Sequence, residues 1–264
     1  MEGATNPNSS TAIGNELFNL IKELQILSSL SSLVLAGGTS LALRFNHRES
    51  DDIDLFVDRI VGVMGLENIQ SELQIFYKED LYHCEIINKE LGDQFCFLRG
   101  FIRKGEIVIK IEITQNMPFT DPVEEYQGIK VLTIKDIGLL KLMSASNRMA
   151  NKDIYDLDYI TDVIPLSQLL YELKAKLARF SGPEYKCLFD LDGQKSPSDD
   201  INLLLAFDNI DYKELPNRPN HSSDILKIID GHKKWVNAKV SWRRKVKQLM
   251  REMNIPIPPA RPIN

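Results

Sequence analysis

The sequence predicts an α/β (α+β) protein, in which a part made of strands and helices is followed by a C-terminal helical domain. Three features of the 264 residues support this fold class. A Gly-Gly-Thr-Ser turn joins the apolar segment 33–36 to a helical pattern. Isoleucine alternates with other residues over 106–114, as is typical of a strand. Beyond Ile164 the apolar spacing becomes helical, which predicts the second part.

The bulk composition is that of a globular protein. Apolar residues make up 43% of the chain and charged residues 26%, values that exclude a disordered or fibrous class. No apolar run approaches the length of a membrane span, and the start MEGATNPNSST has neither a basic leader nor an apolar core. We therefore expect a cytoplasmic protein with no membrane partner.

Cysteine usage and charge distribution narrow the function classes further. The three cysteines form no CxxC pair, which argues against a zinc site or a disulfide framework. From His221 onward there are ten Lys and Arg against three Asp and Glu, which gives this segment a net charge of +7. Because the whole chain has a net charge of −5, the first 220 residues have a net charge of −12. Such a basic end can bind nucleic acid, although a solvated helix face would have the same composition.

Four segments are expected along the chain. We predict a flexible N-terminus at 1–12, a domain at 13–163 that carries the candidate site, a helical domain at 164–254 and a Pro-rich tail at 255–264. Helices are predicted at 13–30, 61–73, 167–180, 184–191, 199–207 and 223–253. Strands are predicted at 33–36, 52–57, 73–77, 81–87, 94–102 and 106–114, with a hairpin turn at Lys104-Gly105.

The first candidate site is the glycine turn. Gly37 and Gly38 let the backbone approach phosphate oxygens, and Thr39 or Ser40 can cap the following helix. The start of that helix would direct amide hydrogens and the positive end of its dipole at a triphosphate. A Gly-Gly pair alone, however, is most often a simple turn.

Two aspartates follow on the next strand. Asp52 and Asp54 point to the same side because side chains alternate along a strand, and two neighbouring carboxylates favour a divalent cation such as magnesium between them. An Asp-x-Asp strand alone can also be a solvated sheet face. The combination with the glycine turn, and with Arg48 and Ser50 in the intervening loop, favours the metal site.

The strand at 106–114 offers two further candidates. If it lies beside the Asp52 strand, Glu112 becomes a third metal carboxylate and Lys110 a phosphate contact. The alternative is an exposed sheet face that carries a lysine and a glutamate.

A third group lies where two helices are predicted to meet. Thr133 is expected to cap a helix that places Lys141 and Arg148 on one face, two turns apart. Lys152 and Asp153 follow, with Asp156 beside Asp153 on a new helix. These charges could neutralise a triphosphate and orient an acceptor hydroxyl, or form a salt-bridged helix pair.

Three blocks carry a family resemblance. GGTSLALRF, HRESDDIDLF and KLMSASNRMANKDIYDLDYI, within 33–160, resemble the AbiEii/AbiGii-type nucleotidyltransferase toxins of type IV toxin-antitoxin and abortive-infection systems, within the polymerase-beta-like minimal nucleotidyltransferase superfamily. The resemblance implies a mixed sheet flanked by helices and a helical domain behind it. It also implies transfer of a nucleoside monophosphate from an NTP to an acceptor hydroxyl, in some members at the end of a tRNA, with Mg²⁺ (or Mn²⁺) as cofactor.

The resemblance also implies roles for single residues. The catalytic set would be Asp52, Asp54, Lys141 and Asp153, with Asp153 as candidate general base. The metal ligands would be Asp52, Asp54 and Glu112, where Glu112 departs from the aspartate more usual at that place. The nucleotide-binding residues would be Gly37, Gly38, Thr39, Ser40, Arg48, Ser50 and Lys152, to which the strand and helix patterns above add Lys110 and Arg148.

Partners and alternatives follow from these assignments. We expect binding of an NTP, of RNA through the basic helix 233–251, and of a cognate antitoxin. One alternative is a catalytically weak nucleotide-binding sensor or interaction module, which a Glu112 side chain pointing away from the aspartates would favour. The other is a small-molecule, aminoglycoside-type nucleotidyltransferase, which needs an acidic acceptor pocket in place of a basic track.

Overall fold

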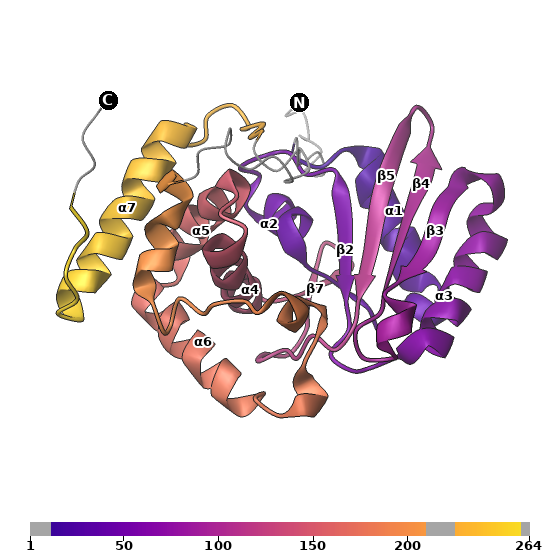
Figure 1. Ribbon diagram of the computed structural model, residues 1–264. Coiled ribbons are helices and arrows are strands. Elements are labelled where there is room, and N and C mark those ends of the chain that lie inside the picture. Colours follow the sequence, from indigo (N-terminus) through magenta and orange to yellow (C-terminus); the bar gives the residue numbers. More distant parts are fainter. Residues whose placement is uncertain (1–11, 210–224, 260–264) are drawn as a thin grey trace, which may run out of the picture. The chain divides into compact units, whose positions relative to one another are not determined.

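The computed structural model describes residues 12–209 and 225–259 (Figure 1). The chain forms two compact units, a sheet unit of Met1–Asp136 with Phe180–Asp192 and a helical unit of Ile137–Arg179 with Gly193–Asn264. The division therefore falls after Asp136, whereas the sequence analysis placed it at 163. The N-terminal segment 1–11 and the end of the tail, 260–264, lie outside the described residues.

The core of the sheet unit is a seven-stranded mixed sheet. Its order is β3-β4-β5-β2-β1-β7-β6, with the pairs β1–β7 and β2–β5 parallel and the other pairs antiparallel. The mixed sheet implied by the family resemblance is confirmed. The strands are β1 (Val34–Leu35), β2 (Asp52–Phe56), β3 (Leu81–Ile87), β4 (Phe97–Lys104), β5 (Ile107–Thr114), β6 (Glu124–Tyr126) and β7 (Ile129–Val131).

Helices cover the apolar face of this sheet. α1 and α3 lie on the same side of it (Figure 1), and the Tyr77 hydroxyl at the end of α3 donates to Glu23 of α1 at 3.3 Å. The α-helices of the sheet unit are α1 (Asn15–Ile26), α2 (Gly37–Phe45) and α3 (Gly62–Tyr77). Its 3₁₀ segments are η1 (Ser28–Leu30), η2 (Lys78–Asp80), η3 (Lys89–Leu91), η4 (Pro183–Tyr185) and η5 (Leu188–Asp192).

Several expected elements differ in type or length. The strand expected at 73–77 is the last turn of α3, because Leu73 and Tyr77 are four residues apart and both buried on one helix face. The helix expected at 184–191 is the pair of short 3₁₀ segments η4 and η5. The β6–β7 hairpin was not predicted, since its two strands have only three residues each.

A segment distant in sequence completes the sheet unit. The side-chain amides of Gln94 and Asn116 donate hydrogen bonds of 2.6 to 3.0 Å to backbone carbonyls within 183–186. These four bonds attach Phe180–Asp192 to the sheet unit, although the residues on both sides of it in sequence belong to the helical unit.

The expected helix start near Thr133 is confirmed. α4 (Ile134–Asn147) begins directly after Thr133, whose hydroxyl accepts a hydrogen bond from the Asp136 amide at 3.0 Å. The Asp136 carboxylate, almost fully buried, accepts further bonds from the backbone amides of Thr120 and Asp121. These hydrogen bonds fix the first turn of α4 to the loop before it.

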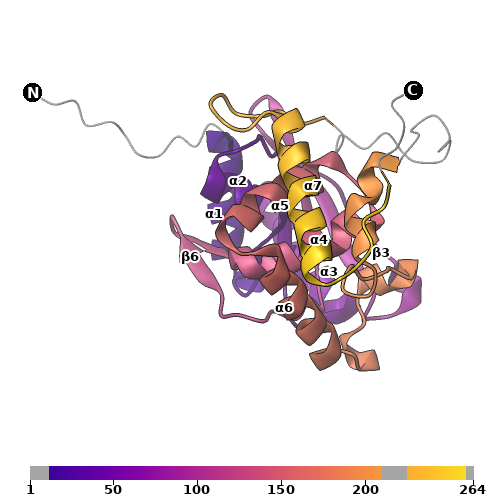
Figure 2. The same cartoon turned by 90° about the vertical axis from the view of Figure 1, so that its left-hand side faces the viewer.

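The helical unit contains the rest of α4, then α5 (Asn151–Val163), α6 (Leu166–Arg179), the 3₁₀ segment η6 (Ile201–Asn209) and α7 (Trp235–Glu252). α5 and α7 lie side by side in both views (Figures 1 and 2). A Cβ at Gly138 of α4 would lie 3.2 Å from Ile160 and 3.1 Å from Leu169, so α4 packs tightly on α5 and α6. This packing explains why α4 and α5 belong to the helical unit.

The last helix is shorter than expected. α7 begins at Trp235, and residues 225–234 are not helical; part of the expected span, 210–224, lies outside the described residues. Trp242 is fully buried and its indole N–H donates to the Leu204 carbonyl at 2.9 Å, while Trp235 meets Phe207 edge to face. Both tryptophans therefore pack against residues of η6. None of the described helices is long and apolar enough to span a bilayer.

Candidate active site

The glycine turn packs directly against one of the two aspartates. Gly37 has φ +64°, and a Cβ atom placed there would lie 2.9 Å from Asp54 Cγ and even closer to a carboxylate oxygen. The Ala36 amide also donates to the Asp54 carbonyl at 2.8 Å, which joins β1 to β2. Only glycine satisfies both the positive φ and the close approach, so the turn and the Asp54 carboxylate are held next to each other.

The start of α2 has no side-chain cap. Its N-cap residue is Ala36, so the prediction that Thr39 or Ser40 caps this helix is wrong; both lie inside its first turn. The Thr39 hydroxyl instead donates to the Asp52 carbonyl and accepts from Ser50 Oγ at 2.8 Å, which ties α2 to the start of β2. The uncapped amides keep the positive end of this helix available to an anion.

Two further turn residues are buried. Ser40 is fully buried, and within the described part of the chain its hydroxyl has no hydrogen-bond partner. Arg48 is almost fully buried, and its guanidinium carbon lies 3.4 Å from the place of a Cβ at Gly38. Arg48 therefore supports the turn from behind and explains why Gly38 has no side chain.

The condition set for Glu112 and Lys110 is met. β5 lies beside β2 in parallel register, with Lys110 opposite Asp52 and Glu112 opposite Asp54. All four side chains therefore lie on one face of the sheet, while Ile53 and its neighbours on β5 are buried on the other face.

Salt bridges connect three of these residues, Asp52, Lys110 and Glu112, and add Arg99. Lys110 Nζ lies 3.2 Å from Asp52 and 3.1 Å from Glu112 Oε2. The other Glu112 oxygen accepts from Arg99 of β4, with Nε at 2.7 Å and Nη2 at 2.6 Å. Burial opposes the charge on Lys110, but the attraction of Asp52, Glu112 and Asp54 outweighs it and raises the pKa of Lys110. At Glu112, burial alone would raise the pKa, but the positive charges of Lys110 and Arg99 outweigh this effect and lower the pKa.

This arrangement fits two of the three expected metal ligands. Asp52, half exposed, and Asp54 present carboxylate oxygens on the face next to the turn. Glu112 has both oxygens engaged by cations. Among the residues that the structure describes, no group of three or more His, Cys, Asp or Glu side chains is arranged to hold a metal ion.

The helical unit gathers the predicted charges of α4 and α5. Lys141 Nζ lies 2.8 Å from Asp153 and 2.8 Å from Asp156, and both carboxylates have 0% exposure. Arg148 forks over both oxygens of Asp153 at 2.9 Å, yet its own side chain is 60% exposed. This is the salt-bridged helix pair that the sequence analysis gave as one interpretation. Lys152 is half-buried in the first turn of α5.

The environment of Asp153 limits what it can do chemically. Burial would raise its pKa, but Lys141 and Arg148 overcome that effect and lower the pKa of Asp153. A carboxylate stabilised in its charged form by two cations is a weak proton acceptor and a strong anchor. Asp153 is thus suited to presenting the exposed Arg148 guanidinium.

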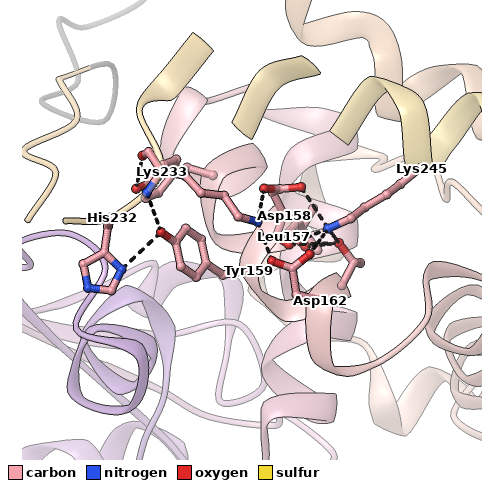
Figure 3. Close-up of polar contacts among 9 residues, drawn as sticks. Leu157, Asp158, Tyr159, Asp162, His232, Lys233 and Lys245 are labelled. Atoms are coloured by element: carbon pink, nitrogen blue, oxygen red, sulfur yellow. Dashed lines mark hydrogen bonds and ion pairs between the residues drawn. The ribbon is translucent and has the colours of Figure 1, made fainter. Parts of the chain in front are cut away.

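Two lysines of the basic C-terminal segment point inward (Figure 3). Lys233 and Lys245 both bind the fully buried Asp158, at 2.7 and 2.9 Å, and both also bind Asp162. Burial works against these charges, yet hydrogen bonds from the lysines lower the pKa of Asp162. Beside them the Tyr159 hydroxyl accepts from the Lys233 amide at 3.0 Å. Lys233 and Lys245 therefore fasten the start and middle of this segment to α5.

One face of α7 carries three further basic residues. Arg244 and Arg251 are exposed and Lys247 is half-buried; spacings of three, four and seven place them on one helix face. Two exposed valines, Val236 and Val240, extend that face toward the start of the helix. We call Arg244, Lys247 and Arg251 the α7 basic stripe.

We call the group of Asp52, Asp54, Arg99, Lys110 and Glu112 the sheet site. One of its residues, Arg99, was not predicted from the sequence. Arg99 lies opposite Glu112 on β4, and that pairing depends on the register of the β4–β5 hairpin. The alternation of Arg99, Phe101 and Arg103 around buried residues was the available signal, but a run of this kind does not show which acid it will face.

An aspartate pair on a mixed sheet, with Asp54 against a glycine turn and an uncapped helix start, is the arrangement expected of a nucleotidyltransferase. The comparison with protein families agrees. Residues 20–241 match the model of the nucleotidyl transferase AbiEii toxins of type IV toxin-antitoxin systems, and the chain belongs to this family.

Two solved structures from Helicobacter pylori are similar to the chain over most of their length. JHP933 is 19% identical, with 92% of this chain and 97% of that chain covered and a TM-score of 0.44. A protein provisionally identified as a nucleotidyltransferase is 20% identical, with 90% and 98% covered and a TM-score of 0.44. No curated protein matches the sequence.

Proposed function

We propose that this nucleotidyltransferase is a metal-dependent toxin that transfers a nucleoside monophosphate from an NTP to a hydroxyl of an RNA acceptor. The observation that supports the proposal is the contact between Gly37 and Asp54, because a turn that binds phosphates and a carboxylate that binds a metal ion have to lie close together. Asp52 on the same face supplies the second carboxylate. A turn for phosphates beside two acids is the requirement of metal-assisted phosphoryl transfer.

Each residue of the sheet site then has a task. Asp52 and Asp54 would hold Mg²⁺ (or Mn²⁺), which when bound neutralises phosphate charge and polarises the phosphoryl oxygens. The first amides of α2 bind oxygens of the triphosphate, and Thr39 with Ser50 keeps them in register with β2. The acceptor oxygen attacks the α phosphorus in line, and the bond to the departing pyrophosphate breaks as the new bond forms.

The charged cluster of the helical unit has a positioning task in this proposal. Within the helical unit, Asp153 and Asp156 fix Lys141, and Asp153 also fixes Arg148, whose side chain is 60% exposed. We assign Asp153 the orientation of these cations in place of the general-base role, because it would have to leave both before accepting a proton. Lys152, next to Asp153 in the same turn, adds a further positive charge.

The choice of RNA as acceptor depends on the α7 basic stripe. Lys233 and Lys245 are engaged with buried or partly buried acids, so they are poorly placed to contact phosphates. Arg244, Lys247 and Arg251 lie on one face of α7 with no acidic residue between them along that face. A line of cations without acids suits a phosphate backbone better than a small cationic antibiotic.

Labelling of RNA tests the central assignment. Purified protein is incubated with total RNA, Mg²⁺ and each α-labelled NTP in turn, and the wild type is expected to label RNA with one of them. Asp52→Asn and Asp54→Asn should each lose the labelling. Asp58→Asn is the matched control, because Asp58 is exposed just beyond β2 and pairs only loosely with Arg59 at 3.9 Å. Unchanged labelling by the first two variants would exclude the site.

Charge reversal tests the acceptor. The triple variant Arg244→Glu, Lys247→Glu, Arg251→Glu should lose RNA labelling at moderate salt while its thermal stability stays close to that of the wild type. Lys174→Glu, on the exposed side of α6, is the control and should label normally. Equal labelling by both variants, or label in a small-molecule acceptor only, would contradict the RNA assignment. Co-expression with the product of the neighbouring reading frame, and rescue of growth, tests the toxin role.

A further inference from the structure

Two cationic side chains of the sheet site bind carboxylates that a site for two metal ions would use as ligands. Two-metal enzymes place two ions about 3.5–4 Å apart between shared carboxylates and phosphates. Such ions need carboxylate oxygens that protein cations do not already occupy. Here three carboxylates, Asp52, Asp54 and Glu112, lie beside two cations, Lys110 and Arg99.

Lys110 lies where the second ion of such a pair would bridge two acids. Its ammonium group is 3.2 Å from Asp52 Oδ2 and 3.1 Å from Glu112 Oε2, so it spans a carboxylate of β2 and one of β5. An ammonium group is a compact point charge, similar in this respect to a metal ion. Asp54, which lies opposite Glu112 in the register of β2 and β5, faces the glycine turn.

The position of Lys110 is fixed by its surroundings. Its side chain is 29% exposed and extends from β5, which lies between β4 and β2 in the sheet. Its partner Glu112 is in turn held by two nitrogens of Arg99 at 2.6 and 2.7 Å. A metal ion that took Glu112 as a ligand would have to break these bonds and would leave two half-buried cations without their shared acid.

We propose that Lys110 takes the place of the second metal ion, so that this enzyme works with a single divalent ion held by Asp52 and Asp54. The inference rests on the proposed function. During transfer the acceptor hydroxyl gives up its proton to solvent water, its oxygen bonds to the α phosphorus, and the bond to the pyrophosphate oxygen breaks. Lys110 stays protonated, forms no covalent bond and supplies positive charge beside the reacting phosphate. Glu112 and Arg99 are positioning residues that hold Lys110 between the acids.

Counting bound ions tests the proposal without relying on turnover. The full chain is saturated with the α,β-methylene analogue of the NTP that labels RNA, and bound Mn²⁺ is measured from the loss of the free Mn²⁺ signal in electron paramagnetic resonance. The wild type should bind one ion per chain beyond that of the nucleotide blank. Lys110→Met should bind two, since Asp52 and Glu112 then have oxygens available for an ion.

Two matched variants separate charge from general disturbance. Lys110→Arg keeps the positive charge and should bind one ion. Lys104→Met removes a lysine of the same β4–β5 hairpin, paired with Glu23 at 2.5 Å and not with Asp52, and should also bind one. Thermal melting of each variant confirms that it is folded.

The remaining outcomes distinguish this inference from the function on which it rests. Two ions in the wild type would overturn the inference and leave metal-dependent transfer intact. One ion in both the wild type and Lys110→Met would also overturn it, because Lys110 would then exclude nothing. No bound ion in the wild type would overturn both proposals.

Discussion

Replacement of Gly37 by alanine is the sharpest single test of the candidate site. A non-glycine residue at φ +64° costs about 1–2 kcal/mol, and the new methyl group would also collide with the Asp54 carboxylate. The first cost lowers the melting temperature by about 2–8 °C for a protein of this size. The collision displaces Asp54, and a displacement of about 1 Å at a reacting centre can reduce the rate about 100-fold.

Gly105→Ala is the matched control for this experiment. Gly105 has φ +59°, but nothing lies within 4 Å of the place of its Cβ, so the variant has the same backbone cost without the collision. Both variants should lose melting temperature through the backbone cost, with a further loss in Gly37→Ala from the collision, and only Gly37→Ala should lose transferase activity in the RNA-labelling assay. If the two variants kept activities within about threefold of each other, the contact between Gly37 and Asp54 would have no catalytic meaning.

Three other predictions concern stability. Lys141→Met should lower the free energy of unfolding by about 3–5 kcal/mol in denaturant titrations, because both carboxylates that Lys141 binds have 0% exposure. Arg148→Met should cost less than about 1 kcal/mol, because the Arg148 side chain is 60% exposed and Asp153 keeps its bond to Lys141. Trp242→Ala should cost about 3–5 kcal/mol in the same titration through the cavity it leaves. Hydrogen bonds from Ser29 lower the pKa of Glu72 from 4.5 to about 2. The wild type should therefore melt at a higher temperature than Glu72→Gln, with the largest difference above pH 4.5 and no difference as the pH falls toward 2.

The metal strand and its neighbour were predictable because their pattern is local. Alternation over Asp52 and Asp54, and over the isoleucines of β5, fixes which side chains share a face. The parallel pairing of β2 with β5 was stated only as a condition, since residues between them in sequence form other strands. Once the pairing exists, the positions of Lys110 and Glu112 follow directly.

Other features depended on contacts that no local pattern contains. The inward direction of Lys233 and Lys245 is set by Asp158, about 80 residues away in sequence, so composition alone indicated a basic surface helix. The helix start at Gly37 needed no cap because the turn is held by Asp54 and Arg48. Likewise, a four-residue apolar spacing at Leu73 and Tyr77 fits a helix, yet a short apolar run is equally typical of a strand.

The attachment of Phe180–Asp192 to the sheet unit by Gln94 and Asn116 has a consequence for dissecting this protein. The polypeptide passes from one unit to the other three times, after Asp136, Arg179 and Asp192, so no single cut in the gene yields either unit whole. A fragment ending at 136 would expose the amides that now hold the 183–186 carbonyls. Permuted or split versions should therefore recover solubility only when that short loop is supplied with the N-terminal piece.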